Sequence, residues 1–274
     1  MQKEDSAVQE LFTAEAAAIP EIPWNVYPRP QLRRERWLCL NGTWELSFKD
    51  VVQKIRVPYC PESLLSGVRQ KPGTGEPMRY RRTFSVPEDW RGMRILLHFG
   101  AVMRKATVFI NGVALARHEN GYLPFSADIT DALHTSENEL CVAVVNDLDT
   151  RYPYGKQTKK RGGMWYTPCS GIWQTVWLEP VPTQYIRSLN IANGPDWAEI
   201  RTDGVETGTV CLNGRMFALE TESQGSRLTS RIFGRLPIRI CMPLQSQAAR
   251  IRCSPILRCA RFRSRRSAAS RACA

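Results

Sequence analysis

The last part of the chain lacks acidic residues, and this absence explains the charge of the whole sequence. Residues 226–274 contain 12 arginines and no lysine, aspartate or glutamate. The formal net charge of the 274 residues is +12, so the other 225 residues hold 26 basic and 26 acidic side chains and are neutral. A sequence pI near 9.5 therefore indicates no basic surface before residue 226, and we do not expect that part to bind nucleic acid.

Long apolar runs are missing as well. No stretch reaches the roughly 18 apolar residues that a membrane-spanning helix needs, so we expect no membrane contact through such a helix. Residues 1–6 are acidic rather than basic, and the apolar segment of a secretory signal does not follow them. We therefore expect a cytoplasmic protein.

Cysteine spacings typical of metal sites are also absent. The nine cysteines contain no CxxC pair, and the chain has only three histidines. An odd number of cysteines without a secretory signal favours free thiols over a disulfide framework. Since His98, His118 and His134 do not stand at ligand spacing from the cysteines, we expect no zinc site, no other metal and no cofactor.

Between residues 24 and 179 the sequence has no long helical period. Short apolar or alternating segments predict β-strands instead, at residues 79–86, 94–99, 105–110 and 139–145. Many short strands at regular spacing predict an all-β sandwich, and its antiparallel form with two packed sheets is a jelly roll. The one predicted helix is a leader over residues 6–18, with Ser6 as its N-cap.

Three Asn-Gly pairs stand inside apolar stretches, at residues 41–42, 111–112 and 213–214. Asn and Gly both tolerate the positive φ angles of a tight type I′ turn. Each pair therefore predicts a β-hairpin.

After residues 180–182 (Pro-Val-Pro) a second β region is expected, with strands at residues 185–192, 198–202, 207–212 and 215–219. So few strands cannot bury a core between two sheets. We therefore divide the chain into a leader and linker (1–22), a β-sandwich domain (23–180), a partial second sandwich (181–225) and a basic tail (226–274).

Two interpretations of the tail stay open. An arginine-rich arm that binds nucleic acid is one. The other is a frame-shifted translation, which the mixture of arginine with four cysteines, isoleucine and leucine favours. In either case we expect the tail to be disordered.

Residues 161–179 carry the most information. Four large aromatic residues stand among glycines and a proline in the order Arg-Gly-Gly-Met-Trp-Tyr-Thr-Pro-Cys-Ser-Gly-Ile-Trp-Gln-Thr-Val-Trp-Leu-Glu. Glycine and proline indicate a loop of fixed shape, which leads into a strand predicted over residues 172–178. We expect Trp165 and Tyr166 to pack in the core rather than to stack on a ligand.

This segment resembles the end of the N-terminal sugar-binding domain of glycoside hydrolase family 2, the β-galactosidase and β-glucuronidase family. Further matching stretches stand in the family's order at residues 29–33, 40–44, 57–58, 80–87, 97–102, 108–113, 121–125 and 128–130. The resemblance implies a galactose-binding-like jelly-roll domain, followed from residue 181 by the start of an immunoglobulin-like domain. It also implies a retaining glycosidase.

Retaining hydrolysis needs two carboxyl groups about 5–5.5 Å apart. In the family both are glutamates on an α/β barrel, and no segment of this chain matches them, so we assign no catalytic residue. The resemblance implies that loops of the first domain form a wall of the substrate pocket. Asp147 is the best match to a sugar-contacting aspartate of the family, and Lys156 and Gln157 follow in the same loop. A carboxylate or an amide suits a sugar because it can form hydrogen bonds with two neighbouring hydroxyl groups. The same aspartate could instead cap a turn.

Three functions follow from these observations. The first is the sugar-binding part of a family 2 glycosidase that binds a β-glycoside weakly and has no turnover of its own. The second is a stand-alone carbohydrate-binding module, which the fold permits without implying. The third, nucleic-acid binding through the tail, is disfavoured by the neutral charge of the first 225 residues. The sequence does not indicate an oligomeric state.

Overall fold

A computed structural model describes most of the chain, and its strands fall into two compact units. The described residues are 16, 18–160, 162–193, 197–205, 209–212, 215–218, 220–221, 227–233, 240–243 and 250–252. One unit comprises residues 1–28 and 34–185, and the other comprises residues 29–33 and 186–274. The predicted leader helix over residues 6–18 lies almost entirely outside the described residues.

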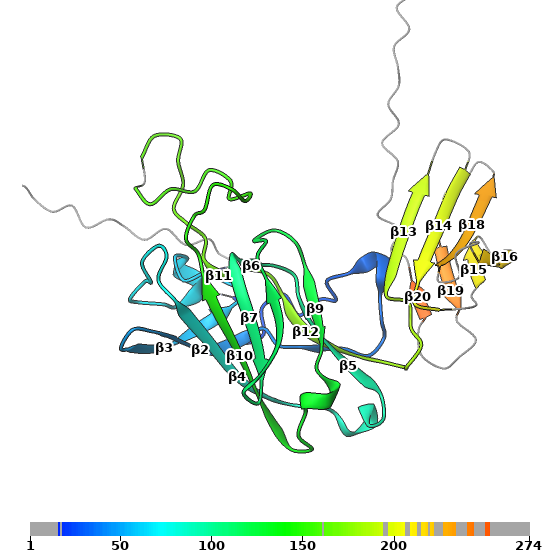
Figure 1. Cartoon of the computed structure of the whole chain (residues 1–274), viewed down its shortest axis with the longest axis horizontal. Helices are drawn as coiled ribbons and strands as arrows, with labels where there is room; N and C mark the ends of the chain where they lie inside the picture. Colours follow the sequence, from blue (N-terminus) through cyan, green and yellow to red (C-terminus); the bar gives the residue numbers. More distant parts are fainter. Residues whose placement is uncertain are drawn as a thin grey trace, which may run out of the picture. The chain divides into compact units, whose positions relative to one another are not determined.

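The first unit is an antiparallel β-sandwich (Figure 1). Its larger sheet has six strands in the order β3-β2-β4-β10-β7-β8, and a sheet of four strands has the order β1-β12-β5-β9. Strands β11 and β6 form a separate pair. The strands are β1 (Leu38–Cys39), β2 (Gly42–Phe48), β3 (Val51–Val57), β4 (Met78–Ser85), β5 (Arg94–Phe99), β6 (Val102–Met103), β7 (Lys105–Ile110), β8 (Val113–His118), β9 (Phe125–Asp128), β10 (Glu137–Val145), β11 (Gly171–Ile172) and β12 (Val176–Val181).

The helices of the described residues are short 3₁₀ turns, apart from isolated helical geometry at Ala16. They are η1 (Pro30–Leu32), η2 (Leu64–Ser66), η3 (Glu88–Trp90) and η4 (Thr130–Ala132). Across the described part of the chain, no helix is long and apolar enough to cross a membrane.

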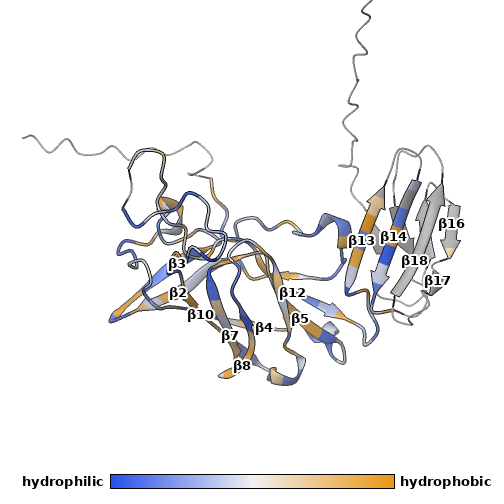
Figure 2. Ribbon diagram, turned by 45° about the horizontal axis from the view of Figure 1, so that its top comes forward, coloured by the Kyte–Doolittle hydropathy of each residue, from blue (hydrophilic) through white to orange (hydrophobic). Residues whose placement is uncertain are grey.

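Successive side chains of a strand point to opposite faces of its sheet, so every second side chain points toward the other sheet. The core lies between the two sheets for this reason. Buried and more exposed positions alternate along β2, β4 and β10, and hydrophobic and hydrophilic segments alternate along strands of this unit in Figure 2. Leu46, Tyr80 and Val142 from the larger sheet share one apolar cluster with Leu97 and Leu178 from the smaller sheet. The predicted all-β, galactose-binding-like sandwich is confirmed.

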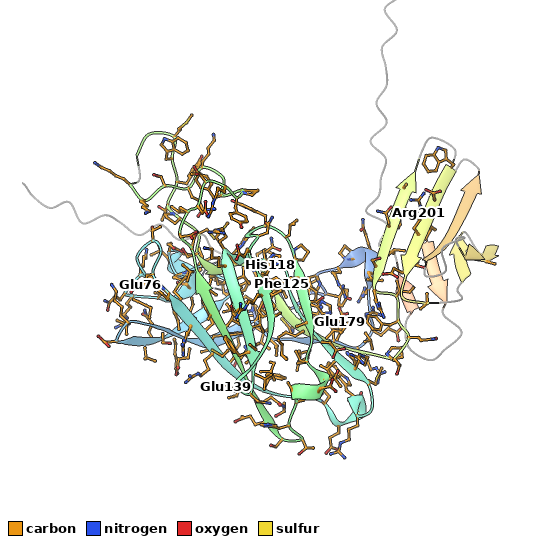
Figure 3. The ribbon with its side chains drawn as sticks, in the orientation of Figure 1. Glu76, His118, Phe125, Glu139, Glu179 and Arg201 are labelled. Carbon is orange, nitrogen blue, oxygen red and sulfur yellow. The ribbon has the colours of Figure 1, made fainter. Side chains whose placement is uncertain are left out.

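Strand β12 is buried on both faces. Its outer face holds Glu179, which is fully buried and accepts hydrogen bonds from Tyr27 Oη (2.5 Å) and Trp177 Nε1 (2.7 Å). Arg34 Nε pairs with the other carboxylate oxygen at 2.9 Å, and His98, stacked on Trp177, lies 3.3 Å from that oxygen. This group of side chains, around Glu179 in Figure 3, fastens the segment before β1 to the outside of the smaller sheet.

Stacked aromatic rings connect the edge strand β8 of the larger sheet to the edge strand β9 of the smaller sheet. His118 of β8 stacks on Phe125 of β9 at 4.4 Å between ring centroids, and Phe125 stacks on Phe99 of β5 at 4.8 Å (Figure 3). Since β8 belongs to the larger sheet and β9 to the smaller one, the stack joins the sheets and fixes the start of the loop that follows His118.

The predicted strand over residues 172–178 is interrupted, which corrects the sequence interpretation. β11 ends at Ile172 and pairs with β6, whereas β12 begins at Val176 and pairs with β5. Between them the backbone bonds to the bend between β5 and β6: Gly100 N donates to Thr175 O (2.9 Å) and Trp173 N to Ala101 O (3.4 Å). The chain changes partner at this bend, so a single continuous strand cannot form.

The sequence pattern predicts that Trp44, Phe84, Phe99, Phe109, Val144 and Trp173 lie inside the sandwich. Four of these six residues are buried: Trp44, Phe84, Phe99 and Val144. The expectation was wrong for Phe109 and Trp173, which are only half-buried. On β7 the inward positions are Ala106, Val108 and Ile110, so Phe109 lies on the opposite face. Trp173 lies in the interruption between β11 and β12, where its Nε1 donates to Gly121 O (2.8 Å).

The three Asn-Gly pairs have different outcomes. Asn111-Gly112 makes the predicted β7–β8 hairpin, with φ angles of 50° and 84°. Asn41-Gly42 does not make a hairpin, because β1 pairs with β12 and β2 pairs with β3 and β4. The buried Asn41 amide instead donates to Pro23 O (2.9 Å) and accepts from Val176 N (2.9 Å). Asn213-Gly214 lies outside the described residues, although the flanking β15 and β16 pair as predicted.

The second unit contains two sheets of four strands, in the orders β13-β14-β18-β17 and β16-β15-β19-β20. The strands are β13 (Ser188–Asn193), β14 (Trp197–Asp203), β15 (Thr209–Leu212), β16 (Arg215–Ala218), β17 (Glu220–Thr221), β18 (Arg227–Phe233), β19 (Ile240–Pro243) and β20 (Arg250–Arg252). Strands β18, β19 and β20 correct the expectation of disorder for residues 227–233, 240–243 and 250–252. The other residues after 225 lie outside the described part of the chain. Leu228 and Ile232 alternate with arginine along β18, and such alternation suits a strand that pairs with β14. A frame-shifted origin of residues 226–274 stays a prediction.

The Glu179 group yields a stability prediction. Replacing Glu179→Ala should lower the free energy of unfolding by ~3–5 kcal/mol, because removing one partner of a buried ion pair leaves the other without its counter-charge. Glu139→Ala is the matched control: this glutamate of β10 is partly exposed and contacts Arg81 at 3.4 Å, so its loss should be below about 1 kcal/mol. Urea unfolding of both variants measures the difference, and equal losses would contradict the structural role of Glu179.

Candidate functional site

The predicted sugar-contacting loop begins directly after the central strand β10. Asn146 is buried at its base, where its amide donates to Ser170 Oγ (3.2 Å) and Cys169 O (3.4 Å). The start and the end of the loop are thus held together, and the intervening residues project as a long loop beside the sandwich (Figure 1). Asp147 is the first carboxylate of this loop.

Asp147 is held by a buried arginine. The side chain of Arg104, between β6 and β7, has no exposed area, and its Nε and Nη2 donate to Asp147 Oδ1 at 3.0 and 2.5 Å. Lys105 Nζ lies 3.1 Å from Asp147 Oδ2. Burial tends to raise the pKa of Asp147, but the hydrogen bonds and charges of Arg104 and Lys105 outweigh it and lower the pKa. Asp147 is therefore ionised at neutral pH, and 32% of its side chain stays exposed.

Two further carboxylates surround the same guanidinium group. Arg104 Nη2 lies 3.4 Å from Asp149 Oδ2, and Nη1 lies 3.9 Å from Glu119 Oε2. The ring of Tyr152 covers the guanidinium at 4.3 Å, while its hydroxyl donates to Glu119 (2.9 Å). Hydrogen bonds from Arg151 hold the pKa of Asp149 far below its ordinary value. We call Arg104, Asp147, Asp149, Glu119 and Tyr152 the Arg104 cluster.

The other two predicted site residues lie elsewhere in the loop. Gln157 is buried, and both ends of its amide are used: Nε2 donates to Tyr154 O (2.7 Å) and Oε1 accepts from Cys169 N (2.7 Å). Lys156 is exposed, and its carbonyl accepts from Tyr166 N (2.8 Å). Among the bonds and ion pairs of the described loop residues, none joins either side chain to Asp147. The structure thus gives Gln157 the contacts of a residue that shapes the loop.

Sequence reasoning missed Arg104, the centre of the cluster. A signal for it exists: it follows the apolar residues 101–103 at a strand end, where a charged side chain cannot reach water without leaving the sandwich. The expectation that Trp165 and Tyr166 pack in the core is wrong. Both are exposed, since loop residues 162–166 turn back on themselves through a Trp165 N to Gly162 O bond (3.1 Å).

A second candidate feature is an aromatic hollow of about 510 Å³ in the first unit. It is open and mainly apolar. Its lining includes Trp24, which is 65% exposed, together with Tyr59, Trp173 and Gln174. We call it the Trp24 hollow. Aromatic faces beside an amide suit a sugar ring, which has both apolar C–H faces and hydroxyl groups.

Comparison with known proteins identifies the family. The model described as "Glycosyl hydrolase 2 galactose-binding domain-like" matches residues 68–210, about half of the chain. The chain therefore belongs to the glycosyl hydrolase 2 family and contains its galactose-binding-like domain.

Curated relatives agree with this assignment. A β-glucuronidase of Paenibacillus borealis is 44% identical over 71 residues, which is 26% of this chain and 12% of that protein. A β-galactosidase of Thermoanaerobacter pseudethanolicus is 32% identical over 111 residues, covering 40% of this chain and 14% of its own length. The matched part is thus a small share of each relative.

Solved structures share the fold. A β-glucuronidase from an uncultured Clostridium species has a TM-score of 0.59 at 20% identity, with 83% of this chain and 45% of that chain covered. A Bifidobacterium dentium β-glucuronidase complexed with coumarin-3-O-glucuronide has a TM-score of 0.57 at 22% identity, with 82% and 48% covered. This chain spans less than half the length of these proteins.

The Arg104 cluster leads to a pH prediction. The pKa of Asp147 is lower in the folded protein than the value of about 3.9 expected when unfolded. Its pairing with Arg104 therefore stabilises the fold fully above pH ~4, and this stabilisation is lost as pH falls through the lower native pKa. We expect Asp147→Asn to reduce the free energy of unfolding at pH 6 and the difference from wild type to shrink below pH ~4. Urea unfolding of both proteins at a series of pH values measures this difference in the free energy of unfolding. A difference that stays the same at every pH would contradict the ion pair.

Proposed function

We propose that this chain is the sugar-binding part of a family 2 glycosidase, and that Asp147 on its Arg104 support accepts hydrogen bonds from hydroxyls of a β-glycoside. In a longer protein the first unit would form one wall of the substrate pocket. The domain border is proposed near residue 180, after β12.

The observation that carries the proposal is the partial exposure of an ionised, rigidly held carboxylate. Arg104 binds Oδ1 and Lys105 binds Oδ2, while about a third of the Asp147 side chain remains exposed. A carboxylate has about four acceptor positions, so unused positions remain for hydroxyl groups. A fixed carboxylate also loses little conformational entropy when it binds a ligand. These properties favour a role of Asp147 in sugar recognition over a role in capping a turn.

The stand-alone carbohydrate-binding module is the second candidate, and the Trp24 hollow favours it. An exposed tryptophan stacks on a pyranose face without help from another domain. The two candidates differ in where the sugar contacts the chain: at Asp147 in the first case, and at Trp24 in the second.

A titration with methyl β-glucuronide and methyl β-galactoside, followed by amide chemical shifts, tests the location. We expect the largest shifts at Asp147 and its neighbours and a Kd of about 1 mM or weaker, equivalent to ~4 kcal/mol at most. The affinity is weak because hydroxyl contacts to an open surface compete with water.

Two variants serve this titration. Asp147→Asn should weaken binding at least about threefold, since hydrogen bonds to a charged acceptor are stronger than those to a neutral amide. Asp50→Asn, in the exposed turn between β2 and β3, should leave binding unchanged. Shifts confined to the Trp24 hollow with Asp147→Asn harmless would reject the Asp147 site, and micromolar binding would favour the stand-alone module.

The chain expressed by itself should not hydrolyse aryl β-galactosides or β-glucuronides above the blank. Retaining hydrolysis needs two carboxyl groups placed about 5–5.5 Å apart on either side of the glycosidic bond, and we match no such pair in the sequence. Turnover that co-purifies with the chain through several chromatographic steps would contradict this expectation.

A further inference from the structure

Two free cysteines from distant parts of the sequence meet at the base of the long loop. Cys60 lies between β3 and β4, and Cys169 lies just before β11. Each thiol is the largest single influence on the pKa of the other, so the two side chains lie within interaction distance. Both are free thiols, and both are half-buried, so small solutes can reach them.

The backbone on both sides of the pair is fixed. Ser170 N, next to Cys169, donates to Glu62 Oε2 (3.0 Å), two residues after Cys60. Cys169 N donates to Gln157 Oε1 (2.7 Å), and Cys60 O accepts from Ser63 N (2.9 Å). The two segments that carry the thiols are therefore anchored, and the bond from Ser170 N to Glu62 joins one segment to the other.

The two thiols differ in reactivity. The hydrogen bond from Cys169 is the main cause that lowers the pKa of Cys60, while that same bond, burial and the Glu62 charge raise the pKa of Cys169. Cys60 is therefore the more easily ionised thiol of the pair, and Cys169 is the less easily ionised one. Burial raises the pKa of Cys39 and Cys141, which makes both less reactive.

A metal site does not account for the pair. Within the described residues, no group of three or more His, Cys, Asp or Glu side chains could hold a metal ion. A more acidic thiol beside a less acidic one is instead the arrangement of an attacking cysteine with a resolving partner.

We propose that Cys60 and Cys169 form a reversible disulfide through exchange with a small-molecule disulfide such as oxidised glutathione. The Cys60 thiolate attacks one sulfur of oxidised glutathione, and a glutathione thiolate leaves. Cys169, having lost its proton to solvent or to that thiolate, then attacks Cys60 Sγ and releases a second glutathione. Two protein thiols are oxidised and one glutathione disulfide is reduced to two thiols, and excess reduced glutathione reverses both steps.

The bond would join the segment after β3 to the end of the loop that carries Asp147 and Gln157. Gln157 bonds to Cys169 N, so the disulfide would act on a loop whose shape that glutamine already sets. The inference does not depend on sugar binding, since its chemistry involves only the two thiols.

The test treats the purified full chain with oxidised glutathione at pH 7.5, blocks the remaining thiols by alkylation and maps the peptides by mass spectrometry. We expect a Cys60–Cys169 crosslink that forms at least tenfold faster than modification of Cys39 or Cys141 and disappears on treatment with reduced glutathione. Cys169→Ser should stop the reaction at a glutathione adduct on Cys60, because the resolving thiol is gone. Cys60→Ser should give neither the adduct nor the crosslink at this rate.

Cys141→Ser is the matched control and should leave the crosslink unchanged. The proposal is overturned if Cys60 reacts no faster than Cys141, if Cys169→Ser accumulates no adduct on Cys60, or if both cysteines are blocked separately without forming the crosslink. Circular dichroism of each variant verifies the fold, and the wild-type reaction decides the matter if a serine variant does not fold.

Discussion

A guanidinium group removed from water has to be surrounded by negative and aromatic groups, and Arg104 imposes this requirement on the end of the sandwich. It is fully buried between β6 and β7, so the loops after β8 and β10 must bring carboxylates to it. Glu119 comes from the first loop, and Asp147 and Asp149 come from the second. The position and the charge of Asp147 are therefore consequences of the burial of Arg104, and the candidate sugar site is the exposed side of an internal ion-pair cluster.

The rest of the first unit holds this cluster in place. Asn146 ties the start of the long loop to its end, and Gln157 shapes the middle of the loop by bonding to Cys169 N. On the far side of β12 the buried Glu179 secures the segment before β1. Each of these polar side chains forms hydrogen bonds with backbone or charged groups that are buried in the sandwich. Such bonds are needed because a buried polar group without a partner is costly. The contact between Cys60 and Cys169 lies at the same loop base, so loop geometry and thiol chemistry are linked there.

Much of the sandwich could be predicted from the sequence, because its strands are short segments that are either apolar throughout or alternate between apolar and polar residues. The strands at residues 94–99 and 105–110 have the predicted bounds. The errors arise where long-range partners outweigh local patterns: Asn41-Gly42 has hairpin chemistry but bonds to Pro23 and Val176, and the strand after Ile172 breaks because it changes partner. The candidate role of Asp147 comes from the family resemblance, and the apolar residues before Arg104 are a local signal for its burial. The pairing of Arg104 with Asp147 and the Cys60–Cys169 pair join residues more than 40 positions apart, so neither leaves a local pattern.

The central proposal is that Asp147 contacts the sugar. It is supported by membership of the glycosyl hydrolase 2 family and by the geometry of the Arg104 cluster. The most direct measurement is a crystal structure of the chain soaked with a methyl β-glycoside at saturating concentration. The account predicts a sugar with a hydroxyl oxygen about 2.5–3.0 Å from a carboxylate oxygen of Asp147, with Arg104 still bound to that carboxylate from behind. A sugar found only in the Trp24 hollow, with the Asp147 surface unoccupied at the same concentration, would contradict it.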